Sequence, residues 1–426
     1  MVKKNKKCFQ FGKFSTKQKK VLTWWLPPSP YKDFDMIIAD GSIRSGKTIS
    51  MIDGFFTWSL SNFDGENFII AGKSMGALKR NVIEPAQQIL NAKNISYNYI
   101  RSGDANIKIG NNTYYLFGGN NEASQDVIQG LTAAGALGDE VALMPRSFVE
   151  QMTARCSVEN SKIWLNCNPG NPYNFLKTEY IDQATKKQIF HLKFELEDNL
   201  NLPQKTIERF KRMYSGVFYQ RYINGLWVVA EGIIYQNFDR DTMIIEQKEL
   251  PSMKEYFIGI DYGHQNATTF ILSGLGEDNK FYIIDEYFHS GKEEKQKSPS
   301  QYVADFLSWY EKIKKTGVKP GRVYVDPSAA GFITELWQKT KKTKEFKIHK
   351  ANNDVMPGIE NVSSLITENR LLTVETCKNV IKEFGTYSWD PKAMERGEDR
   401  PIKQNDHTMD AIRYIVNSRQ KILSSQ

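Results

Sequence analysis

The sequence has few cysteines and no long apolar run. Its four cysteines, Cys8, Cys156, Cys167 and Cys377, lie far apart among 426 residues and form no C-x-x-C pair. This spacing indicates neither a zinc site nor a disulfide framework, so a reducing cytoplasm is the expected environment. No run of about 18 apolar residues occurs, which excludes a helix that spans a membrane. The basic start, MVKKNKKCFQFGKFS, lacks the apolar stretch of a signal peptide.

Internal repeats and long low-complexity stretches are also absent. A chain of 426 residues is too long for one core and should form two or three domains. Apolar residues make up 40% of the chain and aromatic residues 12%, which is enough for well-packed interiors. The formal net charge of +8 fits a polyanionic partner but does not single one out, because many unrelated proteins are as basic.

The most informative stretch is DGSIRSGKTIS at residues 40–50, which has the spacing G-x-x-x-x-G-K-T. Its glycines let the backbone curl so that successive N–H groups point at an anion. Lys47 would reach the β- and γ-phosphates of a nucleoside triphosphate, and Thr48 would supply a hydroxyl to Mg²⁺. The residues of this loop expected to bind ATP with Mg²⁺ are Gly41, Ser42, Arg44, Ser45, Gly46, Lys47 and Thr48.

The neighbours of this loop favour the same interpretation. Residues 35–40, DMIIAD, are typical of a short buried strand, and residues 47–60 are typical of a helix that begins at the loop. A strand, loop and helix in this order place the phosphates at the positive end of a helix. An ordinary glycine-rich turn is the alternative, and the context weighs against it.

Further strand-like runs, including NFIIAG, TYYLFGG and KIWLNCNP, recur as far as residue 170. Their alternation with helical stretches predicts a parallel α/β sheet of the RecA or ASCE kind. Such a sheet places a second acidic site beside the phosphate loop. We expect Asp139 to hold Mg²⁺ through water and Glu140 to polarise the attacking water, although Gly135 interrupts the strand before them. The alternatives are that the pair caps a helix or that Asp126, which follows polar residues, is the acid.

In the stretch WLNCNPGNPYNF at residues 164–175, a predicted strand ends in three polar residues that a Pro-Gly turn follows. Amides beside the nucleotide can sense the γ-phosphate, so Asn166, Cys167 and Asn168 are predicted to couple hydrolysis to movement. A polar turn that bonds to its own backbone is the alternative. Arg44 and Arg155 are both considered for stabilising transition-state charge, and the choice between them stays open. Gln18, upstream of the loop, is a candidate contact for adenine.

The second half of the chain has a different pattern. Three strand-like runs at residues 256–263, 267–275 and 281–288 follow one another with short turns, which demands antiparallel neighbours. A helix-like stretch at 300–315 and a strand at 322–327 come next. This order is the core order of a ribonuclease H-like fold. The expected domains are a basic segment 1–30, a phosphate-loop ATPase 31–228, a linker 229–252 and a nuclease 253–426.

Acidic residues occupy particular places in that order. Asp261 ends the first strand, Asp326 ends the fourth, and Asp410 lies three residues after His407 at the start of a helix. Carboxylates that converge without basic partners would repel one another unless cations lie between them. Two divalent cations, Mg²⁺ or Mn²⁺, could then hold the attacking water and the leaving oxygen of a phosphodiester. His407 is a further ligand or a proton shuttle, against a structural imidazole.

Two further acids are second-tier candidates for the same site. Glu286 lies on the third strand, and Asp406 precedes His407 and could be only a helix cap. An aspartate at a strand end is also an ordinary turn former. The joint occurrence of Asp261, Asp326 and Asp410 in this strand order outweighs these individual alternatives.

Together these motifs resemble the large subunit of the tailed-bacteriophage terminase, in its branch of short, compact chains. The resemblance covers nearly the whole chain and depends on GSIRSGKT, LGDE, NCNPGNPYNF, GIDYG, YVDPSAAGF and DHTMDAIRY, which occur in the family's order. VMPGIENVSSLI and TYSWDP are also similar. The resemblance implies that Lys47, Thr48 and Asp139 bind MgATP and that Glu140 is catalytic. It implies nuclease metals at Asp261, Asp326 and Asp410.

The resemblance also implies a function and a set of partners. ATP hydrolysis would drive double-stranded DNA into a preformed procapsid, and the nuclease would cut concatemeric DNA at the start and end of packaging. The expected partners are the small terminase subunit, the portal protein, and further copies in a pentameric ring docked on the portal. The protein would act in the host cytoplasm, without a membrane, and would not be part of the mature virion.

Two other functions are weighed against this one. A repair or recombination helicase-nuclease shares both chemistries, but no second RecA-like unit follows the first. A DNA-binding scaffold with vestigial sites is disfavoured because Lys47, Glu140 and the three nuclease acids are all present.

Overall fold

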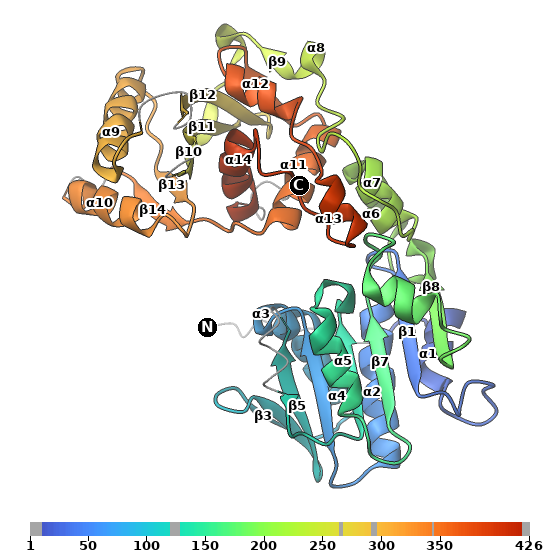
Figure 1. Ribbon diagram of the computed structural model, residues 1–426. Coiled ribbons are helices and arrows are strands. Elements are labelled where there is room, and N and C mark those ends of the chain that lie inside the picture. Colours follow the sequence, from blue (N-terminus) through green and yellow to red (C-terminus); the bar gives the residue numbers. More distant parts are fainter. Residues whose placement is uncertain (1–10, 120–127, 264–266, 291–295, 343–344, 420–426) are drawn as a thin grey trace, which may run out of the picture. The chain divides into compact units, whose positions relative to one another are not determined.

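The computed structural model describes residues 11–119, 128–263, 267–290, 296–342 and 345–419. The chain divides into two compact units (Figure 1). The first runs to Lys211 and also takes in Val217–Val229, and the second comprises Arg212–Gly216 and the chain from Ala230 onward. None of the described helices is long and apolar enough to cross a membrane.

A mixed sheet lies at the centre of the first unit. Among the described residues its strand order is β3-β4-β5-β2-β6-β7-β1-β8, parallel from β5 to β8, with β3 and β4 antiparallel at one edge. The strands are β1 (Met36–Gly41), β2 (Asn67–Gly72), β3 (Asn98–Ile100), β4 (Asn106–Ile109), β5 (Asn112–Gly118), β6 (Gly135–Asp139), β7 (Lys162–Asn166) and β8 (Ile189–Phe194). The helices are α1 (Thr16–Thr23), α2 (Lys47–Asn62), α3 (Met75–Leu78), α4 (Glu84–Ala92) and α5 (Arg146–Ala154), with α6 (Gln204–Met213) and α7 (Gly216–Phe218) near the change of unit.

The first sheet is apolar on both faces, as parallel strands covered by helices require. All six residues of β1 are buried. Helices α1, α2 and α4 pack on one face around Trp24, Phe55 and Trp164, and α5 packs on the other around Phe148. The order places β7 between β1 and β6, so the carboxyl ends of these three strands lie side by side.

The second unit contains another mixed sheet, whose described strands follow the order β14-β13-β10-β11-β12-β15-β9. Its strands are β9 (Ile244–Ile245), β10 (Met253–Asp261), β11 (Thr268–Gly276), β12 (Phe281–His289), β13 (Arg322–Val325), β14 (Lys347–Lys350) and β15 (Leu371–Val374). The helices are α8 (Arg240–Met243), α9 (Pro299–Lys315), α10 (Ala330–Thr340), α11 (Val355–Thr367), α12 (Lys378–Phe384), α13 (Pro391–Glu395) and α14 (His407–Ser418). Strands β10, β11 and β12 are antiparallel neighbours and β13 runs parallel to β10, as a ribonuclease H-like order predicts.

Helix α14 packs unusually close to strand β10. A β-carbon built on Gly259 would lie 2.3 Å from the carbonyl oxygen of Ala411, so only glycine allows this approach. On the opposite face of the sheet, α9 and α10 pack around Phe306 and Phe332. Because Gly259 is two residues from the end of β10, the close approach brings the start of α14 beside Asp261.

Two segments that the sequence analysis set apart from the domains belong to these units. Helix α1, from the basic segment, buries Val21 and Trp24 in the core of the first unit. Strand β9, from the expected linker, pairs in parallel with β15 of the second unit, and Ile245 packs against the core there. Both segments have apolar side chains that are covered by the unit they join.

Candidate nucleotide and nuclease sites

The loop after β1 has the backbone that the glycine spacing predicts. Gly41 and Gly46 have φ angles of 124° and 87°, which side chains other than glycine rarely adopt. At Gly41 a β-carbon would also lie 1.9 Å from the carbonyl oxygen of Phe194. Arg44, at the exposed turn of the loop, has a φ of 54°. The loop is therefore held in one unusual conformation before helix α2 begins at Lys47.

Lys47 is almost fully buried and its ammonium points back over the loop. It donates hydrogen bonds to the carbonyl oxygens of Gly41 (2.9 Å) and Ser42 (2.7 Å) and to Oδ1 of Asn168 (3.2 Å). Burial lowers the pKa of Lys47 to about 8. The side chain is therefore still protonated at neutral pH, and the oxygens that accept its hydrogen bonds are neutral.

Asp139 is the last residue of the buried strand β6, and Glu140 follows it directly. The hydroxyl of Thr48 donates to Oδ1 of Asp139 at 3.3 Å. Burial raises the pKa of Asp139, against the effect of nearby Asn166 and Thr48. Glu140 has a left-handed backbone with a φ of 57°, and burial first and Asp139 second raise its pKa. A strained residue at this place is typical of a functional site.

The three residues after β7 have different surroundings. Asn166 is buried near Asp139, and its Nδ2 has no hydrogen-bond acceptor within the described part of the chain. Asn168 accepts from Lys47. The side chain of Cys167 instead packs in the apolar core beside α5, and burial raises its pKa well above the ordinary value. Asn168 therefore contacts the lysine of the phosphate loop and Asn166 lies near Asp139, while the thiol of Cys167 is part of the apolar core.

Of the remaining residues predicted for the nucleotide site, some lie in or beside the phosphate loop and others lie outside it. Ser42 and Ser45 are buried, and the Ser45 hydroxyl donates to the Ser42 carbonyl at 2.8 Å. Gln18 lies at the loop, with Nε2 3.5 Å from the Gly46 carbonyl oxygen. Arg155 donates to Gln151 of its own helix at 3.1 Å. Asp126 lies outside the described residues.

The sequence analysis missed the segment that holds the base of the loop. The Ser42 hydroxyl donates to the carbonyl of Ile223 at 2.7 Å, and the Ile43 amide donates to the carbonyl of Tyr222 at 3.0 Å. Buried Asp40 accepts from the indole of Trp227 at 2.7 Å and contacts His191 at 2.7 Å. The only feature of the sequence that indicated such partners was the charged Asp40 at the end of the otherwise apolar run of β1. We call residues 221–228 the exit segment, because the chain passes from it to the second unit.

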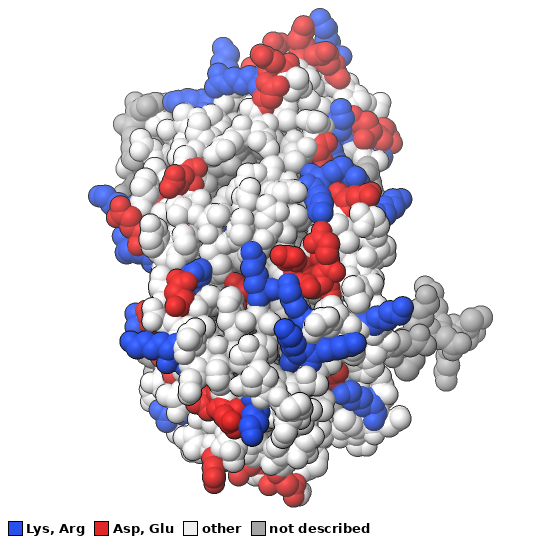
Figure 2. Space-filling model, turned by 90° about the vertical axis from the view of Figure 1, so that its right-hand side faces the viewer, with Lys and Arg blue, Asp and Glu red and all other residues white. Residues whose placement is uncertain are grey.

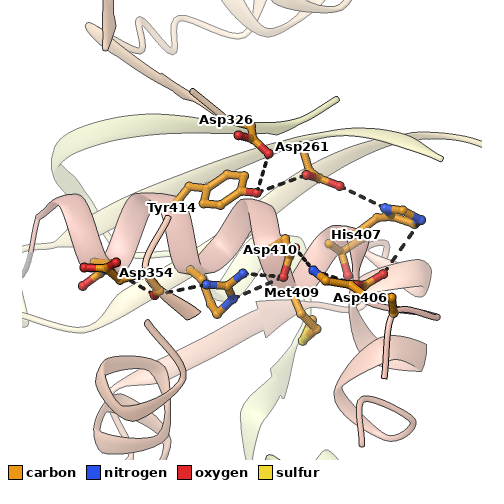
Figure 3. A network of polar contacts seen from close by, with 12 residues as sticks. Asp261, Asp326, Asp354, Asp406, His407, Met409, Asp410 and Tyr414 are labelled. Carbon is orange, nitrogen blue, oxygen red and sulfur yellow. Dashed lines mark hydrogen bonds and ion pairs between the residues drawn. The ribbon is translucent and has the colours of Figure 1, made fainter. Parts of the chain in front are cut away.

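In the second unit, Asp261 and Asp326 come from neighbouring strand ends. Ile260 of β10 is aligned with Val325 of β13, so the residues that follow each of them lie close. The hydroxyl of Tyr414 lies 3.3 Å from Oδ1 of Asp261 and 3.0 Å from Oδ2 of Asp326 (Figure 3). The structure therefore brings these two predicted acids together, with a phenol between them.

His407 joins the same group. Its Nδ1 lies 2.9 Å from Oδ2 of Asp261. Burial raises the pKa of Asp261 to about 6. Burial alone would lower the pKa of His407, but Asp261 and Asp406 outweigh it and raise that pKa. The pair is thus a buried carboxylate with a raised pKa beside an imidazole whose pKa the neighbouring carboxylates raise.

Asp410 has basic partners, contrary to the expectation that the acids converge without them. Nη2 of Arg413 lies 2.6 Å from its Oδ1, and Nζ of Lys403 lies 3.5 Å from its Oδ2. Lys403 is also 3.4 Å from Asp406. Residues three apart on a helix share a face, so Arg413 necessarily lies beside Asp410. Among the residues that the structure describes, no three His, Cys, Asp or Glu side chains are arranged to hold a metal ion.

The second-tier acid Glu286 is used elsewhere. Its carboxylate accepts from the backbone amides of Asn379 at 2.8 Å and Val380 at 2.9 Å, which caps the start of α12. Glu383, which the sequence analysis did not consider, plays the same part at α14, because it accepts from the amide of Thr408 at 2.7 Å. The carboxylates of Glu286 and Glu383 therefore cap the starts of helices α12 and α14, a structural role.

The fold defines a class of protein: a phosphate-loop ATPase unit followed by a ribonuclease H-like unit. Residues 38–242 match the family model of the terminase large subunit, T4likevirus-type, N-terminal, and residues 261–418 match the terminase RNAseH-like domain. The solved large terminase of a thermophilic bacteriophage is 48% identical, with a TM-score of 0.89 over 95% of this chain and 99% of that chain. A structure of the same phage protein in complex with ATP-gamma-S has a TM-score of 0.88 and the same identity and coverage.

A more distant relative supports the same conclusion. The large terminase subunit of Escherichia phage T5 is 23% identical over 237 residues, which are 52% of this chain. The chain spans about 50% of the length of that relative. The chain belongs to the phage large terminase family. The resemblance to the terminase large subunit and the ATPase-plus-nuclease architecture expected from the sequence are both confirmed.

Proposed function

We propose that this chain is an ATP-driven DNA translocase and a divalent-cation-dependent endonuclease of viral genome packaging. It moves double-stranded DNA into a procapsid and cuts concatemeric DNA before and after filling. The observation that carries the proposal is that each unit brings together one set of chemically suited side chains, at strand ends and at the start of a helix. Lys47, Thr48 and Asp139 form the first set, and Asp261 and Asp326 form the second.

The first set suits ATP with Mg²⁺. The neutral oxygens around the Lys47 ammonium are weaker partners than the anionic oxygens of a phosphate, so a bound triphosphate would draw the ammonium to itself. Thr48 and Asp139 would hold Mg²⁺, and Glu140 would orient the attacking water. Nδ2 of Asn166, which has no acceptor among the residues that the structure describes, would donate to that water or to the γ-phosphate. As the ammonium of Lys47 moved toward the phosphate, its hydrogen bond to Asn168 would break. Because Asn168 follows β7, this change would couple nucleotide binding to that strand.

The second set suits Mg²⁺ or Mn²⁺, because carboxylate oxygens are the donors that these hard cations prefer. Asp261 and Asp326 would hold the cations, and His407 would act as a ligand or carry a proton. Arg413 holds Oδ1 of Asp410, so Asp410 would join them through Oδ2, in place of its contact with Lys403. Two bound cations would activate the attacking water and stabilise the leaving oxygen of the phosphodiester.

The proposed partners follow from this function. They are double-stranded DNA, the small terminase subunit, the portal protein and further copies in a pentameric ring, in the host cytoplasm. On the face drawn in Figure 2, basic and acidic side chains are interspersed. The net charge of +8 is therefore not gathered into one block there. The comparisons give no support to a repair or recombination helicase-nuclease.

One experiment tests the proposal. ATP hydrolysis by the purified full chain is measured with and without double-stranded DNA, and plasmid cleavage is measured with Mn²⁺ and with chelator. We expect hydrolysis that DNA stimulates and cleavage that chelator abolishes. A folded chain that binds DNA but has neither activity would instead be a scaffold with vestigial sites.

A further inference from the structure

The contacts of Tyr414 have not been given a role by the proposed mechanism. This side chain is 3% exposed and comes from the middle of α14, while the two acids that it contacts come from β10 and β13. Its hydroxyl lies within 3.3 Å of Asp261 Oδ1 and 3.0 Å of Asp326 Oδ2. Figure 3 shows the phenol pointing from the helix into the space between the two carboxylates.

The other oxygens of both acids are also fixed. Oδ2 of Asp261 contacts His407 at 2.9 Å, and Oδ1 of Asp326 accepts from the amide of Ser328 at 2.8 Å. One oxygen of each carboxylate is thus held by a separate partner, His407 for Asp261 and Ser328 for Asp326. The other oxygen of each lies at the hydroxyl of Tyr414. A phenol has one proton to donate, so it bonds to one acid at a time and keeps the other within reach.

The ring itself has little freedom. Gly259 lets α14 approach β10 so closely that the helix backbone touches the strand, and the ring is enclosed. Without the hydroxyl, two like charges at adjacent strand ends would move apart. A cation that binds both acids would then have to bring them together again, and this reorganisation would weaken binding.

We propose that Tyr414 is a positioning residue of the nuclease site, whose hydroxyl keeps Asp261 and Asp326 at the separation that a divalent cation requires. This inference rests on the proposed assignment of cations to these two acids. The hydroxyl donates to a carboxylate oxygen both before and after a cation enters, so its hydrogen bond is retained and its geometric effect remains. The opposite role, a hydroxyl that competes with the cation for the two acids, would give the opposite result on removal.

The test is Mn²⁺ binding to the full chain, followed through the electron paramagnetic resonance signal of free Mn²⁺. The Asp139→Asn background removes the cation ligand of the nucleotide site, and Asp326→Asn in that background identifies the nuclease site. We expect Tyr414→Phe to weaken the Asp326-dependent site by about 10- to 100-fold, which is the usual effect of losing a partner that orients a metal ligand. Tyr387→Phe is the matched control, because that hydroxyl is also buried but has no hydrogen-bond partner among the described residues.

Plasmid cleavage as a function of Mn²⁺ concentration gives a second readout. In Tyr414→Phe the midpoint of activation should move to higher Mn²⁺ while the rate at saturation stays near the parent rate. General damage to the fold would lower the saturated rate instead. Unchanged or tighter Mn²⁺ binding in Tyr414→Phe would overturn the inference alone. A parent chain without any Asp326-dependent Mn²⁺ site would overturn the cation assignment as well.

Discussion

In the ATPase unit, the polar groups of the candidate site come mainly from the backbone of one loop and from the ends of three adjacent strands. In the nuclease unit, the polar groups of the candidate site are side chains from segments that are distant in the sequence. Lys47 finds its partners within the loop and one strand away. Asp261, by contrast, depends on His407 and Tyr414 of a helix about 150 residues later in the chain. The phosphate loop is also held by main-chain hydrogen bonds to Phe194 and Tyr222, whereas the nuclease side chains hold one another through side-chain contacts.

The largest expected effect separates the two units. Lys47→Ala should lower ATP hydrolysis by at least about 100-fold, because the γ-phosphate loses its main cationic contact. Mn²⁺-dependent plasmid cleavage should stay at the parent rate, since the loop and the nuclease acids belong to different compact units. Steady-state ATPase and cleavage assays on the same preparation check this. A folded variant that has lost both activities would contradict the separation.

Substitutions of two of the proposed nuclease acids should differ in their effect on stability. Asp326→Asn should abolish cleavage and leave stability near that of the parent. Asp410→Ala should also lower the free energy of unfolding by about 3–5 kcal/mol, because it leaves the buried guanidinium of Arg413 without its carboxylate. Denaturant unfolding of both variants measures this difference. Equal stabilities would show that the Arg413 pair matters little.

A smaller effect should appear in the pH dependence of stability without metal. Burial raises the pKa of Asp261 from 3.8 to about 6, so the folded chain binds this proton more tightly than the unfolded chain does. The resulting stability is fully present below pH 3.8 and is lost as the pH rises through about 6. The Asp261→Asn variant should match the parent near pH 4 and be the more stable of the two near pH 7. Unfolding curves in chelator at both pH values decide it, and equal differences at both would contradict the shift.

The smallest effect concerns lysines around the nuclease. This part of the chain has a cluster of lysines whose positive charges suit DNA phosphates, namely Lys312, Lys314, Lys315, Lys339, Lys341, Lys342, Lys344 and Lys347. Lys314 pairs with Glu311 and Glu345, and Lys344 lies outside the described residues. DNA affinity should fall steeply with salt and depend little on sequence.

Single substitutions sharpen that expectation. Lys341→Gln should reduce the slope of log affinity against log salt by about 1 if this lysine contacts phosphate. Lys314→Gln is the matched control, because its charge is already paired. An unchanged slope in Lys341→Gln would assign the exposed lysines to a solvated face.

The ATPase fold and most of its site could be predicted because their residues are close in the sequence. The glycine spacing determines a loop, and the buried runs around it determine the strands, so Lys47, Thr48 and Asp139 were found from local patterns. The partners of Asp40 could not be found in this way, since Trp227 and His191 are more than 150 residues away. The candidate nuclease acids were predicted from strand order, and the structure brings Asp261 and Asp326 together around Tyr414. The contact of Arg413 with Asp410 followed from helix spacing but was overlooked, and the place of Tyr414 depends on the approach that Gly259 permits.

The exit segment has a mechanical consequence. It is fastened to the phosphate loop by Ser42 and Ile43, to β1 by Trp227, and to the loop after β7 by a hydrogen bond from the Val228 amide to the Gly170 carbonyl at 3.3 Å. Only Val229 separates this segment from Ala230, where the chain enters the second unit for the last time. We expect a shift of the phosphate loop to move the exit segment with it, because these hydrogen bonds join the two.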